Sequence, residues 1–345
     1  MDVETLSKKF LLDGIDADSF ILFNQMEASS NLSKGKKYKM PIRIYPFNNI
    51  NIRQSVGIKD YKLAKSIQAY NEKLSRLGLK KSSLAKGGDI WVPLNFFYAS
   101  QPKFAPFTTN YALLGKNDEV AVVDNSLKNQ VFYLISGHGG PDPGANCIKD
   151  GNMVCEDEYA YDITLRLARN LISHGGKVYM IVSDKNDGIR DDTFLKHDHD
   201  ETTCDGEVIP LNQIKRLKQR TDLVNKLFKE HKGAAKQKLI EIHIDSRNED
   251  KKIDLFFYHF SGSQAGKKLA DQLLETVKSK YNTHQKDRGY NGVVESRNLY
   301  SLRETLPLSV YIEVGNITNE FDQRRILIAN NRQALANWLA EGLMK

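Results

Sequence analysis

Apolar runs of strand length alternate with amphipathic stretches along most of the chain. Val131–Ile135 is a short apolar run typical of a buried strand. Within Glu156–Ser173, apolar residues recur every four positions at Ile163, Leu167 and Leu171, as on one face of a helix. Strands that alternate with helices are typical of a sheet with helices on its faces. The pattern therefore predicts an α/β fold.

The same alternation predicts further elements. The predicted strands are Glu119–Val123, Lys177–Val182, Leu239–Ile244, Ile253–His259 and Leu308–Val314. The predicted helices are Asn212–His231, Gln264–Tyr281 and a terminal helix from Asn319 through Leu343. A polar, acid-rich loop covers Ser183–Leu211, and its histidines His197 and His199 form an H-x-H pair that can bind metal. Because the loop is so long and acidic, we favour the interpretation that it is a solvated segment that covers the site, and not a metal-binding segment.

The first hundred residues contain an internal repeat. Leu32–Pro41 aligns with Leu84–Pro93 in the pattern L-x-K-G-x-x-φ-x-φ-P, where φ is apolar, and an aromatic–Asn pair precedes each copy (Asn24 and Asn71). Each copy predicts a helix, a Lys-Gly turn and a short strand closed by proline, which has no N–H to donate. We therefore predict a smaller α+β domain at 1–97, a connector at 98–127 and the main domain at 128–345.

Ionisable side chains lie where the predicted strands end. Val131–Ile135 runs into a glycine-rich turn that carries His138, while His243 and Glu313 lie near the ends of two later strands. Glu156 opens the helix after the first strand. Ligands bind at the carboxyl ends of strands in α/β sheets. If these ends share an edge, two imidazoles and two carboxylates converge.

Two histidines and one glutamate form a known catalytic zinc set that leaves a fourth position for water. Zinc lowers the pKa of water and polarises a carbonyl, and a carboxylate off the metal can carry a proton to the leaving amine. This is the chemistry of amide hydrolysis. The residues also have structural interpretations: a histidine near a strand end is often a satisfied core residue, and Glu156 and Glu158 suit the positive end of a helix dipole.

Composition narrows the partners. A net charge of +7 suits either an anionic polymer, such as nucleic acid or cell wall, or simple solubility. The chain lacks the arginine–aromatic interleaving of a nucleic-acid surface, so we expect no nucleic-acid partner. We also expect no transmembrane segment and no signal peptide in this chain. Three cysteines allow one disulfide but form no disulfide scaffold and no C-x-x-C motif.

Five ordered blocks carry a resemblance from Val131 to the end of the chain. They are Ile135–Ala145, Glu156–Ala168, Arg220 with Asn225, Glu241–Asp245 and Leu302–Asp322. In the first block ISGHGGPDPGA stands for D-P-G-H-G-G-x-D-x-G-A, and in the fourth EIHID stands for S-I-H-A-N. This part resembles the zinc-dependent N-acetylmuramoyl-L-alanine amidases of the type 3 amidase family. The resemblance implies a mixed, mostly parallel sheet flanked by helices, of the amidase/phosphorylase-like kind.

By this resemblance His138, Glu156 and His243 bind one Zn²⁺, and Glu313 is the catalytic carboxylate. Arg303 either contacts substrate or holds the sheet edge. The family cleaves the amide bond between N-acetylmuramic acid and the L-alanine of the peptidoglycan stem peptide. Asp245 and the long loop depart from the family pattern without touching a proposed ligand.

The two N-terminal copies resemble degenerate LysM modules, which bind N-acetylglucosamine-containing glycans, although the usual opening strand is not visible in either copy. The resulting expectation is an extracytoplasmic peptidoglycan amidase, in the periplasm or cell envelope, with a regulatory protein partner. Two alternatives are a zinc peptidase that acts on stem peptides and a non-catalytic, glycan-binding activator.

Overall fold

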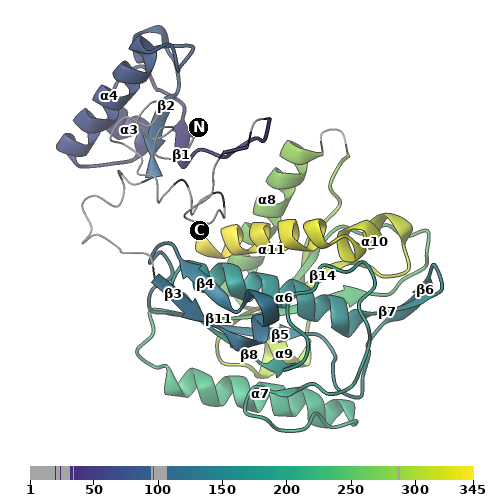
Figure 1. Cartoon of the computed structure of the whole chain (residues 1–345). Coiled ribbons are helices and arrows are strands. Elements are labelled where there is room, and N and C mark those ends of the chain that lie inside the picture. The colour runs from purple at the N-terminus through teal and green to yellow at the C-terminus, as the bar shows by residue number, and fades with distance from the viewer. Residues whose placement is uncertain are drawn as a thin grey trace. The chain divides into compact units, whose positions relative to one another are not determined.

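The computed structural model describes residues 20, 24, 32–33, 35–94, 96, 107–285 and 288–345. Internal contacts divide the chain into two compact units, Met1–Ala105 and Pro106–Lys345 (Figure 1). Residues 107–127, which we predicted within a connector, therefore belong to the larger unit. They pack against its first long helix: the Val123 N–H donates to the Ser173 carbonyl at 2.7 Å, and Asp124 pairs with His174 at 2.8 Å.

A six-stranded sheet forms the centre of the larger unit. In spatial order its strands are β13 (Val293–Ser296), β12 (Phe256–His259), β14 (Leu308–Asn316), β11 (Lys236–Asp245), β5 (Gln130–Ser136) and β8 (Lys177–Met180). The strands β14, β11, β5 and β8 run parallel, and β12 is antiparallel to β14. The mixed, mostly parallel sheet is therefore confirmed.

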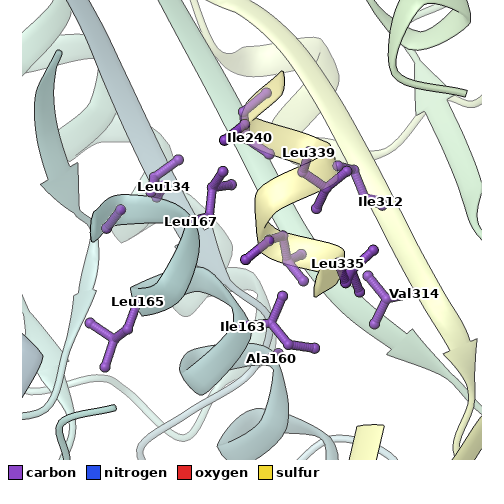
Figure 2. Packing of buried hydrophobic residues seen from close by; sticks show 14 of the residues in the cluster. Leu134, Ala160, Ile163, Leu165, Leu167, Ile240, Ile312, Val314, Leu335 and Leu339 are labelled. Atoms are coloured by element: carbon purple, nitrogen blue, oxygen red, sulfur yellow. The ribbon is translucent and has the colours of Figure 1, made fainter. Parts of the chain in front are cut away.

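Alternate residues of the central strands bury their side chains on opposite faces of the sheet. The helices of this unit are α6 (Glu156–Ser173), α7 (Gln213–Glu230), α8 (Gln264–His284), α9 (Tyr300–Glu304), α10 (Glu320–Leu327) and α11 (Ala329–Met344). On one face Leu134 and Ile240 pack with α6 and α11 (Figure 2). Residues of α8 belong to the same cluster. On the other face Tyr133 and Leu239 pack with α7. The predicted flanking helices are confirmed.

The predicted terminal helix is two helices, because Ile328 is extended between α10 and α11. The cause is tertiary. Arg332 is fully buried, and its guanidinium donates to the carbonyls of Ile326 and Leu327 at 2.8 and 3.0 Å. These carbonyls at the end of α10 are thus satisfied by a side chain instead of by a continuing helix.

Among the described residues of the larger unit, three short strand pairs lie outside the main sheet: β3 (Phe107–Asn110) with β4 (Glu119–Val122), β6 (Asn146–Lys149) with β7 (Asn152–Cys155), and β9 (Val182–Ser183) with β10 (Thr202–Thr203). We did not predict the β6–β7 hairpin, although Asp150-Gly151 is a strong hairpin signal and both residues have positive φ. None of the described helices is both long and apolar enough to cross a membrane.

In the smaller unit, β1 (Ile42–Tyr45) pairs antiparallel with β2 (Ile90–Pro93). Between them lie α3 (Ile52–Val56), α4 (Tyr61–Arg76) and the short 3₁₀ helix η2 (Leu84–Lys86). The second repeat copy forms the helix, turn and strand that we predicted. In the first copy the prediction was wrong, because residues 36–40 form no strand and β1 begins after Pro41. The helix expected before Asn24 lies largely outside the described residues.

An asparagine makes the same pair of hydrogen bonds in each repeat copy. The Asn71 amide donates to the Trp91 carbonyl at 2.7 Å and accepts from the Trp91 N–H at 2.8 Å. Asn24 makes the same two bonds with Lys39, at 2.8 and 2.7 Å. Trp91 and Lys39 each lie two residues before the proline that closes their copy. The repeat seen in the sequence is thus a repeat of hydrogen bonding.

Candidate metal centre and active site

His138 is held on a strained turn just beyond the end of β5. Its φ is +60°, in the left-handed region that non-glycine residues rarely adopt. The turn is closed by the Gly139 N–H, which donates to the Asp142 carbonyl at 2.8 Å. The His138 Nδ1 atom lies 2.9 Å from Asp142 Oδ2, which also pairs with Arg216. These contacts fix the imidazole ring and leave its Nε2 atom facing Glu156.

Glu156 is the first residue of α6, and both of its carboxylate oxygens are in use. Oε1 accepts from the Ile244 N–H at 2.8 Å, and Oε2 accepts from the Ala145 N–H at 2.9 Å. Oε2 lies 3.3 Å from His138 Nε2, and Oε1 lies 2.9 Å from His243 Nδ1. A carboxylate with this many donors is held in one position.

His243 lies near the end of β11, beside Glu313 of β14 in the parallel register. The ring centroids of His138 and His243 are 5.0 Å apart. One ligand atom from each of His138, Glu156 and His243 lies within 4.8 Å of the other two. The structure thus brings together three residues from a stretch of more than a hundred positions of the sequence.

Two glycines let this group form. A Cβ atom on Gly137 would lie 2.3 Å from His243 Nδ1, which no real contact allows. A Cβ on Gly144, where φ is +69°, would lie 2.6 Å from His138 Cδ2 and 2.7 Å from Glu156 Oε2. The glycine-rich sequence around His138 is therefore needed for close approach as well as for turning the chain.

Each histidine has a further carboxylate on its other ring nitrogen. Asp142 serves His138, and Glu241 Oε1 lies 3.2 Å from His243 Nε2. Glu241 is buried, and the positive charge of Arg220 on α7 acts on its carboxylate. Arg220 also donates a hydrogen bond to the His138 carbonyl. From the sequence we assigned no role to Asp142 or Glu241. The available signal for Glu241 was its place two residues before His243, on the same face of the strand.

These carboxylates shift the protonation of their neighbours. Burial opposes a charge on His243, but hydrogen bonds with Glu156 and Glu241 outweigh it and raise the pKa of His243 to about 10. Burial would raise the pKa of Glu156, yet its hydrogen bond with His243 and the charges of both histidines hold it below its ordinary value. The hydrogen bond with His138 lowers the pKa of Asp142. The metal-free group therefore favours a cation among carboxylates.

One carboxylate oxygen of Glu313 is buried without a hydrogen-bond partner among the described residues, as is one oxygen of Glu241. Burial raises the pKa of Glu313 to about 8 against the opposing charge of His243, and Glu156 and Asp245 add to the rise. A carboxyl group with a pKa near neutrality is suited to accept and return a proton.

Arg303 lies apart from this group in its contacts. On α9, its guanidinium donates to Glu304 at 2.6 Å and to Asn298 at 3.2 Å. Asn225, the other member of the Arg220 block, holds the nearby chain in place. It donates to the Glu304 carbonyl at 2.8 Å and accepts from the Leu306 N–H at 2.7 Å.

The residues present fit a zinc ion. Two imidazoles and one carboxylate are a known ligand set for catalytic zinc, and histidine ligands usually have a carboxylate or carbonyl on the second ring nitrogen, as both have here. Glu313 lies opposite His243 in the register of β11 and β14, and its unpartnered oxygen lacks the hydrogen bonds that occupy Glu156.

The fold and this group of side chains define an α/β domain with a candidate metal centre at the carboxyl ends of parallel strands. The family model described as N-acetylmuramoyl-L-alanine amidase matches residues 133–345, which is more than half of the chain. The chain therefore belongs to the N-acetylmuramoyl-L-alanine amidase family and is an enzyme of that family. No curated protein matches it significantly.

Several solved structures are similar to the chain. An N-acetylmuramoyl-L-alanine amidase from Clostridium difficile 630 is 22% identical, covers 62% of this chain and 94% of its own, and has a TM-score of 0.45. The amidase AmiC2 of Nostoc punctiforme is 19% identical over 62% of this chain and 95% of its own, with a TM-score of 0.44. The catalytic domain of CwlV from Bacillus (Paenibacillus) polymyxa var. colistinus is 19% identical over 62% and 96%, also with a TM-score of 0.44.

Proposed function

We propose that the chain is a zinc-dependent peptidoglycan amidase that cleaves the bond between N-acetylmuramic acid and L-alanine. The observation that carries the proposal is the convergence of the ligand atoms of His138, Glu156 and His243 within 4.8 Å, with Glu313 opposite His243 on the next strand. The family match supplies the amidase chemistry and the peptidoglycan substrate.

His138, Glu156 and His243 would hold the ion. When bound, zinc supplies a Lewis acid that polarises the amide carbonyl and makes water more acidic. Glu313 accepts a proton from the attacking water as the water oxygen bonds to the carbonyl carbon. Glu313 then returns the proton to the alanine nitrogen as the C–N bond breaks. The products are the lactyl carboxylate of muramic acid and a stem peptide with a free L-alanine amino group.

Asp142 and Glu241 are positioning residues in this scheme. Each accepts a hydrogen bond from the ring nitrogen that does not face Glu156, which fixes the orientation of the imidazole and raises its basicity as a ligand. Arg303 retains its proposed role in binding substrate, and its exposed guanidinium is restrained by Glu304 and Asn298.

Digestion of purified peptidoglycan sacculi tests the reaction. Labelling of new amino groups should identify L-alanine alone, together with glycan strands that carry intact lactyl carboxylates. New amino groups on any other residue would indicate the alternative zinc peptidase. A zinc-loaded protein that releases nothing would support the non-catalytic activator and contradict the amidase proposal.

Elemental analysis tests the metal. His243→Ala should lose both activity and one equivalent of zinc, because the variant retains only two of the three proposed ligands. His284→Ala, on α8, is a matched control in which the zinc content should not change. A His243→Ala protein with the zinc content of the wild type would contradict the ligand assignment.

Location and partners follow from the substrate. Since peptidoglycan lies outside the cytoplasmic membrane, we propose that the enzyme acts there, in the periplasm or cell envelope. We propose that the N-terminal unit binds the glycan as LysM-like modules do. Co-sedimentation of the chain with sacculi, while soluble peptidoglycan fragments saturate the active site, would test this proposal. A regulatory protein partner stays a prediction.

A further inference from the structure

A second group of ligand-type side chains lies beside the first turn of α6. Cys155, Asp157 and His197 each place one ligand atom within 4.8 Å of the other two. Cys155 and Asp157 flank Glu156 in the sequence, whereas His197 comes from the 183–211 loop. None of the three takes part in the proposed hydrolysis.

The spacing of these atoms is longer than that of good hydrogen bonds. His197 Nδ1 lies 3.6 Å from Asp157 Oδ2 and 3.5 Å from Glu158 Oε1. Hydrogen bonds between nitrogen and oxygen are typically 2.7–3.2 Å long. In a tetrahedral zinc site with bonds of about 2.0–2.3 Å, neighbouring ligand atoms lie roughly 3.3–3.7 Å apart. The observed distances match the edges of such a site.

Two of the atoms lack any other partner. Asp157 is only 2% exposed, and its Oδ2 atom is buried without a hydrogen-bond partner among the described residues. The same is true of His197 Nδ1. Buried polar atoms are nearly always satisfied in folded proteins, so these two atoms, which face each other, indicate a missing ligand between them.

Charge points the same way. The carboxylates of Asp157, Glu158 and Glu201 are all buried and lie within 4.8 Å of one another. Arg190 pairs with Glu158 at 2.9 Å, but no lysine or arginine pairs with Asp157 or Glu201 in the described part of the chain. A buried carboxylate without a cation costs several kcal/mol, and a divalent cation would remove that cost.

We propose that Cys155, Asp157 and His197 bind a second divalent cation of the zinc type, with Glu158 as the nearest further carboxylate. A thiolate, an imidazole and a carboxylate are donors that zinc accepts together. The ion fastens the 183–211 loop to the start of α6. The proposal does not depend on the proposed function, because the two ligand sets share no residue.

The 183–211 loop also supports the turn that carries His138. The Gly140 N–H donates to Glu201 Oε2 at 2.7 Å, and His199 Nδ1 lies 2.9 Å from the Gly140 carbonyl. The H-x-H pair is therefore split. His199 is exposed and contacts the backbone, whereas the side chain of His197 is 15% exposed and faces the acids. Our expectation of a solvated cover was wrong at His197.

Metal stoichiometry tests the proposal. The full chain, saturated with Zn²⁺ and freed of excess metal, should contain two equivalents by elemental analysis. His197→Ala and Asp157→Asn should each contain one, and His284→Ala, which changes a histidine of α8 outside both ligand sets, should contain two. A wild type with one equivalent that His197→Ala retains would overturn the proposal.

The same measurement separates the two sites. His243→Ala should keep the equivalent that His197→Ala loses, and the double variant should contain none. If only the equivalent lost in His243→Ala exists, the second site fails and the proposed function stands. If only the equivalent lost in His197→Ala exists, the second site stands and the metal ligands of the proposed function fail.

A spectroscopic test identifies the donor without relying on a folded loop variant. Co²⁺ bound to His243→Ala should show a thiolate-to-cobalt charge-transfer band in the near ultraviolet, because Cys155 supplies sulfur. The band should vanish in the additional Cys155→Ser variant and persist in Cys204→Ser, which removes an exposed free thiol. A cobalt spectrum with no such band would overturn the assignment of Cys155.

Discussion

Strand β11 buries an ionisable group near each end, and the surroundings of the two groups shift their pKa values in opposite directions. At the amino end, Lys238 donates to the Leu343 carbonyl at 2.9 Å and has no carboxylate partner among the described residues. Burial lowers the pKa of Lys238 to about 8. At the carboxyl end, His243 lies between Glu156 and Glu241, which raise its pKa to about 10.

The difference shows what makes one end of the strand a site. Burial acts against charge at both ends, but only the carboxyl end receives side chains from a helix start, a glycine turn and a neighbouring strand. Those side chains supply fixed charges in a region of low dielectric constant, where they act strongly. The amino end is structural. Four variants test this contrast, in order of decreasing expected effect.

Glu313→Gln should have the largest effect at the carboxyl end. It removes the proton carrier but none of the proposed metal ligands, so kcat on sacculi should fall by about 10³-fold while zinc content stays the same. Glu295→Gln, an exposed carboxylate of the same sheet, is the control and should change kcat little. Activity near that of the wild type in Glu313→Gln would exclude the proposed role.

Glu241→Gln should weaken zinc binding by about 10–100-fold, because the second partner of a histidine ligand fixes its ring. Competition with a chelating dye measures this affinity. Excess Zn²⁺ should restore much of the activity of Glu241→Gln but none of the activity of Glu313→Gln. Unchanged zinc affinity would show that Glu241 acts only in packing.

Gly144→Ala should reduce zinc affinity about tenfold or more, because the new Cβ would press on His138 and Glu156. It should also cost about 1 kcal/mol of stability through its positive φ. Gly151→Ala is a matched control, since Gly151 has a φ of +78° and no atom within 4 Å of the built Cβ. Equal zinc loss in both variants would mean that backbone strain, and not contact with the ligands, is responsible.

Lys238→Met should have the smallest effect, on stability alone. A lysine with a lowered pKa is neutral in the folded protein while the unfolded chain still binds a proton, so stability rises with pH between about 8 and the ordinary value of 10.5. The variant should lose about 1–2 kcal/mol of this rise, as measured by urea unfolding at several pH values. Identical pH profiles would show that Lys238 titrates normally.

Much of the larger unit could be predicted from the sequence. The runs around Leu134 and Ile312 are apolar enough to identify buried strands, and the glycine-rich turn marks the position of His138. Glu241 and His243 were harder to interpret, because alternation in LIEIHI is equally typical of a strand with one polar, solvated face. That face is buried because α7, a helix distant in sequence, packs against it.

Tertiary contacts explain the remaining differences. The break at Ile328 has no proline or glycine to signal it, and only the buried guanidinium of Arg332 accounts for it. The pairing of His197 with Asp157 joins residues 40 positions apart across an irregular loop. Local patterns contain no information about such pairs, because they depend on the packing of elements that are distant in sequence.

Arg332 also has a consequence for the order in which the molecule is built. Its guanidinium donates to Asp162 at 2.6 Å and to the carbonyls of Arg190 and Asp192 at 2.8 and 3.0 Å. A nascent polypeptide has made those three partners long before the ribosome reaches codon 332. We therefore expect the segment that carries His197 to reach its final position only after α11 has been synthesised.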